Sequence, residues 1–238
     1  MIIGCWNIAW ARPDSQTGRQ MVATLLSYEP EVICIAEGHA DTLHEGWHGI
    51  TSDADYGYGN KPARRKVALW SLQPWHHVDT VGSADLPPGR LVSGQTQTSL
   101  GPIRVIGICV PWFAAHVKGG RGDAKNWEEH NAYLQGLRGI LSAVGDDMPT
   151  VLIGDLNQHI PRKRAPRLSH DLLLEALGPR FSIWTAGQIQ DLDRQVVCHI
   201  GGNAALTCNG VAGLSRAVGE HQLSDHDGLI AQIARCDR

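Results

Sequence analysis

The sequence predicts an α/β fold, a sandwich of two β-sheets with helices on the outside. Short apolar runs rich in β-branched residues recur along the 238-residue chain, and stretches with helical spacing stand between them. Strands and helices alternate, but several strands lie close together, so a regular strand–helix repeat fits less well. The composition, 42% hydrophobic and 19% charged, supports a sizeable core. We expect residues 1–238 to form a single domain.

Seven apolar runs are the predicted strands. Each is short and has the β-branched content of a strand that is buried on both faces. In chain order they are Ile2–Ile8, Glu31–Ala36, Lys66–Trp70, Ile103–Val110, Val151–Gly154, Val196–Ile200 and Leu229–Ile233.

Three segments with helical spacing are the predicted helices. Gly18–Tyr28 places its large apolar residues on one face. Asp123–Val144 is longer and carries a continuous apolar stripe. Ser169–Leu177 is shorter, and Ser169 is its expected N-cap because a serine hydroxyl accepts hydrogen bonds from the first turn.

Charge and cysteine content limit the choice of partners and compartment. The net charge of −3 does not by itself indicate a polyanion ligand, so basic loops and bound metal would have to attract a nucleic acid. No stretch approaches the roughly 20 apolar residues of a membrane span, and the first residues are typical of a strand rather than of a signal peptide. Six cysteines without a CxxC pair favour reduced thiols and the cytoplasm. Nothing indicates an obligate protein partner.

Polar or aromatic residues stand at the ends of five predicted strands. Each of them alone is commonly an ordinary turn or loop residue. Together they can converge on one rim of a sheet, where binding and catalytic sites are usually built. In chain order they are Asn7, Glu37, Trp112 with His116, Asp155 with Asn157, and Asp225 with His226.

These residue types suit the hydrolysis of a phosphodiester. The reaction needs a hard cation beside the phosphoryl oxygens, and carboxylates bind Mg²⁺ or Mn²⁺. An Asp can orient or deprotonate the attacking water, and Asn and His can donate hydrogen bonds to the developing charge. A zinc site fits less well, because the adjacent pairs His76-His77 and Cys198-His199 would point to opposite faces of a strand.

The order of these groups resembles the endonuclease/exonuclease/phosphatase superfamily, with AP endonucleases and deoxyribonucleases as its nearest kind. The likeness runs from Trp6-Asn7 to Ser224-Asp225-His226. Its most specific pieces are Gly-Asp-Leu-Asn at residues 154–157 and the Ser-Asp-His near the C-terminus. The resemblance implies a four-layer α/β/β/α sandwich of two packed mixed β-sheets with outer helices. It also implies a phosphoesterase that depends on Mg²⁺ or Mn²⁺.

The resemblance implies a metal site. Glu37 would bind the divalent ion and Asn7 would lie close to it. Asp225 would assist the metal or its bound waters.

The resemblance also implies catalytic roles. Asp155 would position or activate the attacking water, and Asn157 would hold a phosphate oxygen. His226 would contact the scissile phosphate, and His116 is a further candidate for reaching the same phosphate.

Two cysteines depart from the family pattern. Cys198 stands where the family has an Asp that orients the catalytic His, and Cys109 stands where it has a Tyr or His. A thiol is a poor substitute for a carboxylate that stabilises an imidazolium. We therefore expect His226 to be held less well and to have a lower pKa than it would beside a carboxylate. Asp191 or Asp193 is a candidate replacement for the missing carboxylate.

A basic loop directly after Asn157 suggests where substrate binds. Such a run is often only a solvated loop, but its position beside the expected site favours contact with phosphate. Arg64–Lys66 and Lys118–Arg121 are expected to form two further basic loops. Trp112 is the best-placed stacking surface. The positive residues of the first loop are Arg162, Lys163, Arg164 and Arg167.

Three functions remain open on these grounds. The first is a nuclease that hydrolyses DNA or RNA, with DNA as the preferred expectation. The second is a phosphoesterase for a small or lipid-linked phosphate, which the negative net charge and the lack of a long basic stripe favour. The third is a binding module of the same fold whose catalysis Cys109 and Cys198 have weakened.

Overall fold

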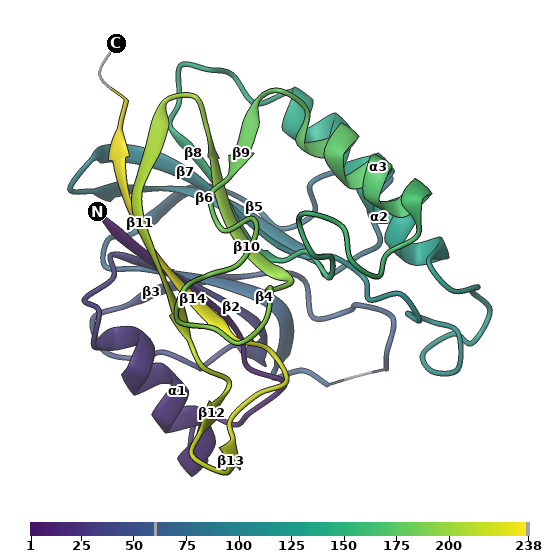
Figure 1. Cartoon of the computed structure of the whole chain (residues 1–238), viewed down its shortest axis with the longest axis horizontal. Coiled ribbons are helices and arrows are strands. Elements are labelled where there is room, and N and C mark those ends of the chain that lie inside the picture. Colours follow the sequence, from purple (N-terminus) through teal and green to yellow (C-terminus); the bar gives the residue numbers. More distant parts are fainter. Residues whose placement is uncertain (60, 237–238) are drawn as a thin grey trace.

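The structure, a computed structural model, describes residues 1–59 and 61–236 and is built on two packed β-sheets (Figure 1). Asn60, Asp237 and Arg238, which belong to the predicted domain, lie outside the described residues. The first sheet consists, in spatial order, of β11 (Leu206–Leu214), β14 (Gly228–Arg235), β1 (Ile2–Asn7), β2 (Val32–His39), β4 (Arg64–Ser71) and β3 (His48–Thr51).

The second sheet also has six strands, and both sheets are mixed. β1 and β2 are parallel in the first sheet, β7 and β8 are parallel in the second, and the other pairs are antiparallel. In spatial order the second sheet consists of β5 (Trp75–Asp79), β6 (Leu91–Thr98), β7 (Gly101–Cys109), β8 (Thr150–Asp155), β10 (Cys198–Asn203) and β9 (Phe181–Ile183). A separate small hairpin pairs β12 (Ala217–Val218) with β13 (His221–Gln222).

Helices cover the outer face of each sheet (Figure 1). α1 (Gln16–Leu26) packs on the first sheet, through Met21 and Leu25. α2 (Glu128–Ser142) and α3 (Arg167–Leu177) pack together on the second sheet. The layers therefore run helix, sheet, sheet, helix, and the predicted α/β/β/α sandwich is confirmed.

The largest core cluster lies between the two sheets. Val32, Cys34 and Ala36 of β2 belong to this cluster, whereas Ile33 and Ile35 pack under α1. Successive side chains of a strand point to opposite faces, so a strand with a neighbour on both faces is apolar throughout. This is why the central strands were predictable as continuous apolar runs.

The helices differ from prediction at their ends. The second helix begins at Glu128 rather than Asp123, because Trp127 has a left-handed φ of 71° that breaks the helical path before it. Ser169 is not the N-cap of the third helix, which starts at Arg167 after Pro166. Ser169 instead lies within the first turn of the helix, and its side chain is buried.

The predicted basic loop at Arg64–Lys66 is wrong, since these residues begin β4. Seven strands have no counterpart among the predicted runs: β3, β5, β6, β9, β11, β12 and β13. Their sequences carry exposed or polar positions, as in the exposed His76 and His77 of β5. Within the described part of the chain, no helix has both the length and the apolarity needed to span a bilayer.

Candidate active site

Strands of both sheets end at one pocket. β1 and β2 are parallel neighbours, so Asn7 at the end of β1 lies near Glu37 in the last part of β2. Asp155 is the last residue of β8 in the opposing sheet. His226 lies in the turn that leads into β14, the other neighbour of β1. The packing of the two sheets thus brings residues distant in sequence to the same place.

We call this cavity the strand-end pocket; its volume is about 340 Å³. Its wall includes seven of the candidate site residues found from the sequence. They are Asn7, Glu37, Trp112, Asp155, Asn157, Asp225 and His226.

Asp155 is the most tightly held carboxylate of the pocket, with 1% of its surface exposed. Its Oδ1 accepts a hydrogen bond from the backbone N–H of Asn157 at 2.9 Å. Its Oδ2 accepts from the amides of Asn7 at 2.9 Å and of Asn157 at 3.1 Å. Burial raises the pKa of Asp155 above its usual value, and His226 and the hydrogen-bond donors only partly offset this. A fixed carboxylate with a raised pKa is suited to accept a proton.

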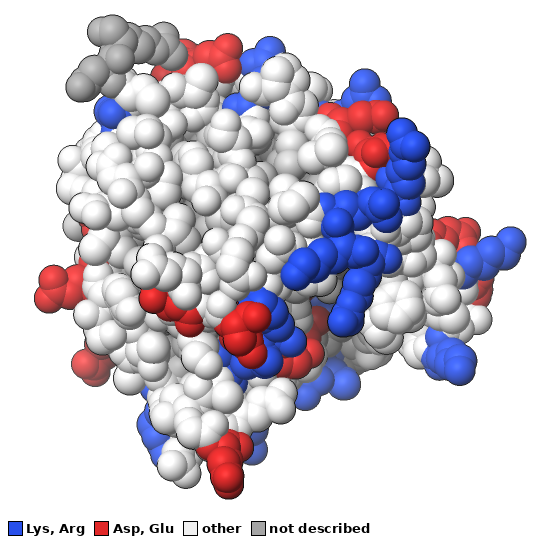
Figure 2. All heavy atoms as spheres, viewed as in Figure 1, with Lys and Arg blue, Asp and Glu red and all other residues white. Residues whose placement is uncertain are grey.

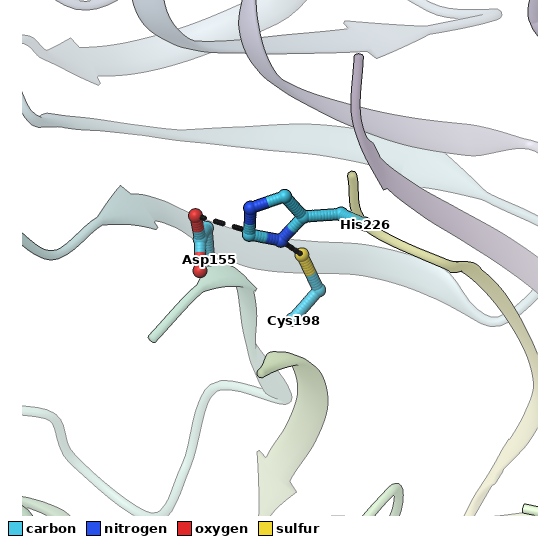
Figure 3. A group of neighbouring side chains, drawn as sticks. All are labelled: Asp155, Cys198 and His226. Atoms are coloured by element: carbon cyan, nitrogen blue, oxygen red, sulfur yellow. Dashed lines mark hydrogen bonds and ion pairs between the residues drawn. The ribbon is translucent and has the colours of Figure 1, made fainter. Parts of the chain in front are cut away.

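The imidazole of His226 lies between Asp155 and Cys198 (Figure 3). Nδ1 is 3.9 Å from Asp155 Oδ2 and 3.5 Å from Cys198 Sγ, and Nε2 is 3.8 Å from Asp225 Oδ1. Burial alone would lower the pKa of His226, but the negative charge of Asp155, the hydrogen bond with Cys198 and the negative charge of Asp225 outweigh it and raise the pKa to about 10. The ring therefore lies beside two carboxylates, Asp155 and Asp225, although Cys198 stands where a carboxylate was sought in the sequence.

Cys198 lies beside His226, where its family counterpart was expected to be. It is the register partner of Asp155 across β10 and β8. A hydrogen bond with the Cys5 thiol, together with burial, raises the pKa of Cys198, so the group is a neutral thiol. Asp191 and Asp193 do not replace the missing carboxylate: both are exposed, and Asp193 pairs with Arg216 at 3.4 Å. They lie on the surface segment before β10 rather than in the pocket.

Glu37 carries an ion pair inside the pocket. Its Oε1 is 2.5 Å from the ammonium of Lys66, a buried residue of β4. The ammonium also lies over three aromatic rings, at 5.0 Å from Trp10, 5.5 Å from Tyr56 and 5.9 Å from Tyr58. The pocket therefore combines carboxylates with a fixed positive charge.

Two groups of side chains are candidates for holding a metal. Asp155, Cys198 and His226 have potential ligand atoms within 4.8 Å of one another. This set suits Mg²⁺ or Mn²⁺ poorly, because the Cys198 sulfur is a soft donor and these hard cations prefer oxygen ligands. Glu37 and the exposed Asp225 offer hard carboxylate oxygens, which fit Mg²⁺ or Mn²⁺.

The two asparagines orient Asp155. The Asn7 amide donates to Asp155, while its Oδ1 accepts from the N–H of Ala9 at 3.0 Å. The Asn157 amide donates to the Val110 carbonyl at 2.8 Å as well as to Asp155. Both amide hydrogens of Asn157 are thus in use, and in this geometry it positions Asp155 rather than offering a donor to a phosphate oxygen.

His116 and Cys109 do not line the strand-end pocket. The His116 side chain is buried and its ring stacks on Tyr58, with centroids 4.4 Å apart. Its Nδ1 accepts the backbone N–H of Arg121, and burial lowers its pKa. His116 therefore supports Tyr58, which does line the pocket. Cys109 lies in the core between the sheets, where burial raises the pKa of its thiol.

The four positive side chains of the basic loop after Asn157 lie in different surroundings. Lys163 and Arg164 line a larger cavity beside the strand-end pocket, and Trp112 lines both cavities. Arg162 donates to the carbonyl of Ala165 at 3.0 Å and braces the loop itself. Arg167 belongs to α3 and points to solvent near Asp171.

Several pocket residues were not found from the sequence. They lie in loops or within strands and carry no motif of their own. Lys66 was visible only as part of a basic triplet, and its ion pair with Glu37 depends on the pairing of β2 with β4. Arg64 and Lys66 were expected only as part of a basic loop, and the residues that were not foreseen at all are Trp10, Tyr56, Tyr58, Lys61, Arg90 and Val110.

Comparison with known families agrees with this geometry. A family model described as the Endonuclease/Exonuclease/phosphatase family matches residues 4–226, nearly the whole chain. The chain belongs to this family. Its members are hydrolases that act on phosphoester bonds, and the resemblance read from the sequence motifs is confirmed.

Solved structures of this fold include several proteins of the same family, all with low sequence identity. The chain is similar to an AP endonuclease from Archaeoglobus fulgidus, with 18% identity, 98% of each chain covered and a TM-score of 0.71. It is similar to a 3'-5' exonuclease from Neisseria meningitidis, with 18% identity, 98% and 100% covered and a TM-score of 0.69. It is also similar to the catalytic domain of human nocturnin, with 16% identity, 99% and 93% covered and a TM-score of 0.68. Among curated proteins, none matches this sequence.

Proposed function

We propose that the protein is a phosphodiesterase that depends on Mg²⁺ or Mn²⁺ and hydrolyses nucleic acid, with DNA as the first expectation. One observation carries the proposal. The buried Asp155, fixed by Asn7 and Asn157, faces a protonated His226 in the same pocket as Glu37. A proton acceptor, a cationic donor and a hard metal ligand are the parts that hydrolysis of a phosphoester requires.

Each part has a task in this proposal. Asp155 takes a proton from the attacking water, and the amides of Asn7 and Asn157 keep its oxygens aimed while it does so. His226 donates a hydrogen bond and positive charge to a phosphoryl oxygen. Lys66 adds a second fixed positive charge on the far side of Glu37.

Glu37 would hold the metal ion, with Asp225 assisting from the pocket rim and Asn7 close by. When bound, the ion neutralises charge on the phosphoryl oxygens and lowers the pKa of a bound water. The ion pair with Lys66 keeps the Glu37 carboxylate at the pocket wall.

Nucleic acid is favoured because basic and aromatic side chains continue beyond the pocket. Lys163, Arg164 and Trp112 lie in the adjoining cavity, as expected for residues that contact a phosphate backbone and a base. The six cysteines are free thiols, which supports a cytoplasmic setting where thiols stay reduced.

A small phosphate is the second candidate substrate. The strand-end pocket has a volume of only about 340 Å³, and the net charge of the chain is −3. The positive side chains Lys61, Arg64, Lys66 and Arg90 would surround a small phosphate group on several sides.

A substrate panel separates these candidates. The purified protein is incubated with plasmid, single-stranded DNA, RNA and a phosphatase substrate, with Mn²⁺ or with a chelator. We expect Mn²⁺-dependent cleavage of nucleic acid that Asp155→Asn lowers by about 10²- to 10⁴-fold. Asp147→Asn, on an exposed loop before β8, is the matched control and should keep full activity. Full hydrolysis in excess chelator would contradict the metal dependence, and turnover of the phosphatase substrate alone would favour the second candidate.

A further inference from the structure

A second cavity opens beside the strand-end pocket. Its volume is about 710 Å³, and we call it the side groove. The two cavities share part of their walls, so a ligand in one can continue into the other. The shared residues are Trp112, Asn157, Asp225 and His226.

One wall of the side groove is aromatic. Trp112 and Phe113 are 47% and 45% exposed, although large apolar side chains are normally buried in a fold of this size. Their ring centroids are 5.0 Å apart with an interplanar angle of 74°. Trp127 supports Phe113 from 5.9 Å. The wall therefore presents held, solvent-accessible ring surfaces next to the proposed reaction centre.

The other wall is basic. Lys163 and Arg164 come from the loop between β8 and α3, and Arg194 comes from the segment before β10. Figure 2 shows Lys and Arg side chains gathered in a band across the face of the molecule on which this loop lies. The positive potential also acts on His159, whose pKa is lowered by burial and then by Lys163, Arg164 and Arg194.

Arg194 is held in place although it is exposed. Its Nε donates to Asp227 Oδ2 at 3.2 Å and its Nη2 donates to the Asp225 carbonyl at 2.5 Å. Asp227 is buried and also pairs with Arg216 at 3.1 Å. The guanidinium of Arg194 is thus fixed by the same turn that carries His226, while 45% of its side chain stays exposed. An arginine held in this way has little side-chain freedom left, so its binding to a phosphate costs little further conformational entropy.

We propose that the side groove binds an unpaired stretch of nucleic acid that flanks the scissile phosphate. A base stacks on Trp112 and Phe113, and the backbone phosphates lie along Lys163, Arg164 and Arg194. Ring surfaces inside a groove are accessible only to a base that is outside a double helix, and stacking accepts any base. The preferred substrate is therefore a single strand or an unpaired end, with little sequence preference. This inference rests on the proposed function.

Binding without turnover tests the groove directly. A fluorescent oligothymidylate of about 12 nucleotides and a blunt duplex of the same length are titrated with protein in the presence of chelator, and anisotropy is recorded. We expect the single strand to bind at least about tenfold more tightly than the duplex, which corresponds to the loss of one stacked base. Trp112→Ala and Phe113→Ala should each weaken binding of the single strand by roughly 5- to 150-fold.

The basic wall is tested by salt dependence. Arg194→Met and, separately, Lys163→Met should each reduce the log–log slope of affinity against salt by about one unit. Among the residues that the structure describes, Lys163 has no buried ion-pair partner, so Lys163→Met keeps the test valid if Arg194→Met loosens the turn around Asp227. The matched controls are Arg138→Met, an exposed arginine on α2, and Tyr28→Ala, an exposed tyrosine; both should leave affinity and slope unchanged.

The outcomes separate this inference from the proposed function. Equal affinity for duplex and single strand, or unchanged affinity in all four groove variants, would overturn the side-groove assignment. Hydrolysis of bis(p-nitrophenyl) phosphate by the wild-type protein with Mn²⁺ tests the strand-end pocket alone. Hydrolysis of this diester without strand binding refutes the groove and keeps the phosphodiesterase. Strand binding through the groove without any hydrolysis supports the groove and refutes the catalytic proposal.

Discussion

The protonation states of Asp155 and His226 set the chemistry of the strand-end pocket at the scale of single residues. Burial raises the pKa of Asp155, and the surrounding acidic groups raise that of His226 to about 10. The pair therefore places a buried carboxyl group that can accept a proton beside a readily protonated imidazole. Such a pair can accept a proton on one side and stabilise negative charge on the other.

The pKa of His226 predicts how stability depends on pH. The folded value of about 10 lies above the ordinary value of 6.5, so protonation favours the folded state. The contribution of His226 is fully present below about pH 6.5 and is lost as the pH rises towards 10. The urea midpoints of the wild type and His226→Gln should converge over this range. A difference that stays constant from pH 6 to about pH 10 would contradict the raised pKa.

Cys198 provides a second test at this scale. Cys198→Asp would place a second carboxylate directly beside the buried Asp155, its register partner. We expect the free energy of unfolding to fall by roughly 1–3 kcal/mol, because one more charge is buried. Cys198→Ser keeps the site neutral and is the matched control in urea unfolding.

The surface carboxylates complete this test. Asp191→Asn and Asp193→Asn should leave both the stability and the pH profile of hydrolysis unchanged, since the carboxylates beside His226 are Asp155 and Asp225. A shifted pH profile of hydrolysis in either variant would show that the carboxylate removed there interacts with His226.

Residue identity at the site was predictable only in part. Asn7, Glu37, Asp155, Asn157, Asp225 and His226 could be found because each follows an apolar strand or belongs to a short motif. Lys66 and the aromatic residues around it could not, because their place depends on antiparallel pairing of β2 with β4 and on loop paths. The replacement partner for Cys198 was sought nearby in sequence, whereas the structure supplies it across the two sheets.

At the scale of the elements, a strand could be predicted from the sequence when both of its faces are buried. Strands buried on both faces, such as β2 and β8, appear as unbroken apolar runs. β5 lies at a sheet edge and exposes His76 and His77, and β6 is polar or glycine after Leu91 and Val92, so neither forms such a run. Helix ends were missed where a loop determines them, as at Trp127 with its left-handed backbone.

Gly154 links the geometry of an element to the position of a catalytic group. Its φ is +140°, and a Cβ added there would lie 1.9 Å from the Ile108 carbonyl oxygen of β7. Gly154→Ala should therefore push β8 away from β7 and displace the adjoining Asp155. We expect a loss of at least about 2 kcal/mol in the free energy of unfolding, together with loss of hydrolysis.

A second glycine gives the matched control. Gly139 lies on the exposed face of α2, and a Cβ there would meet nothing within 4 Å. Gly139→Ala should stabilise the protein by up to about 1 kcal/mol and leave hydrolysis unchanged, because alanine is the better helix former. Equal urea midpoints for the two variants would show that close packing of β8 on β7 at Gly154 does not limit the stability of the protein.

At the scale of the whole molecule, the site belongs to neither sheet alone. Asn7 and Glu37 come from strands of the first sheet, whereas Asp155 and Cys198 come from strands of the second. Sequence periodicity describes one strand at a time, so it cannot show which strand ends face each other across the core. The shared placement at strand ends and the family resemblance together indicated that they would meet.

Because both sheets contribute residues to the strand-end pocket, a ligand bound there holds the two sheets together. Binding energy that depends on both sheets is available only while they are docked, so occupancy resists their separation. Mn²⁺ with inorganic phosphate at about 100 times its dissociation constant should raise the melting temperature by roughly 5–10 °C. Amide hydrogen exchange should slow in β1 and β2 and equally in β8 and β10. Slower amide exchange in one sheet only would mean that the ligand binds to that sheet alone and does not hold the two sheets together.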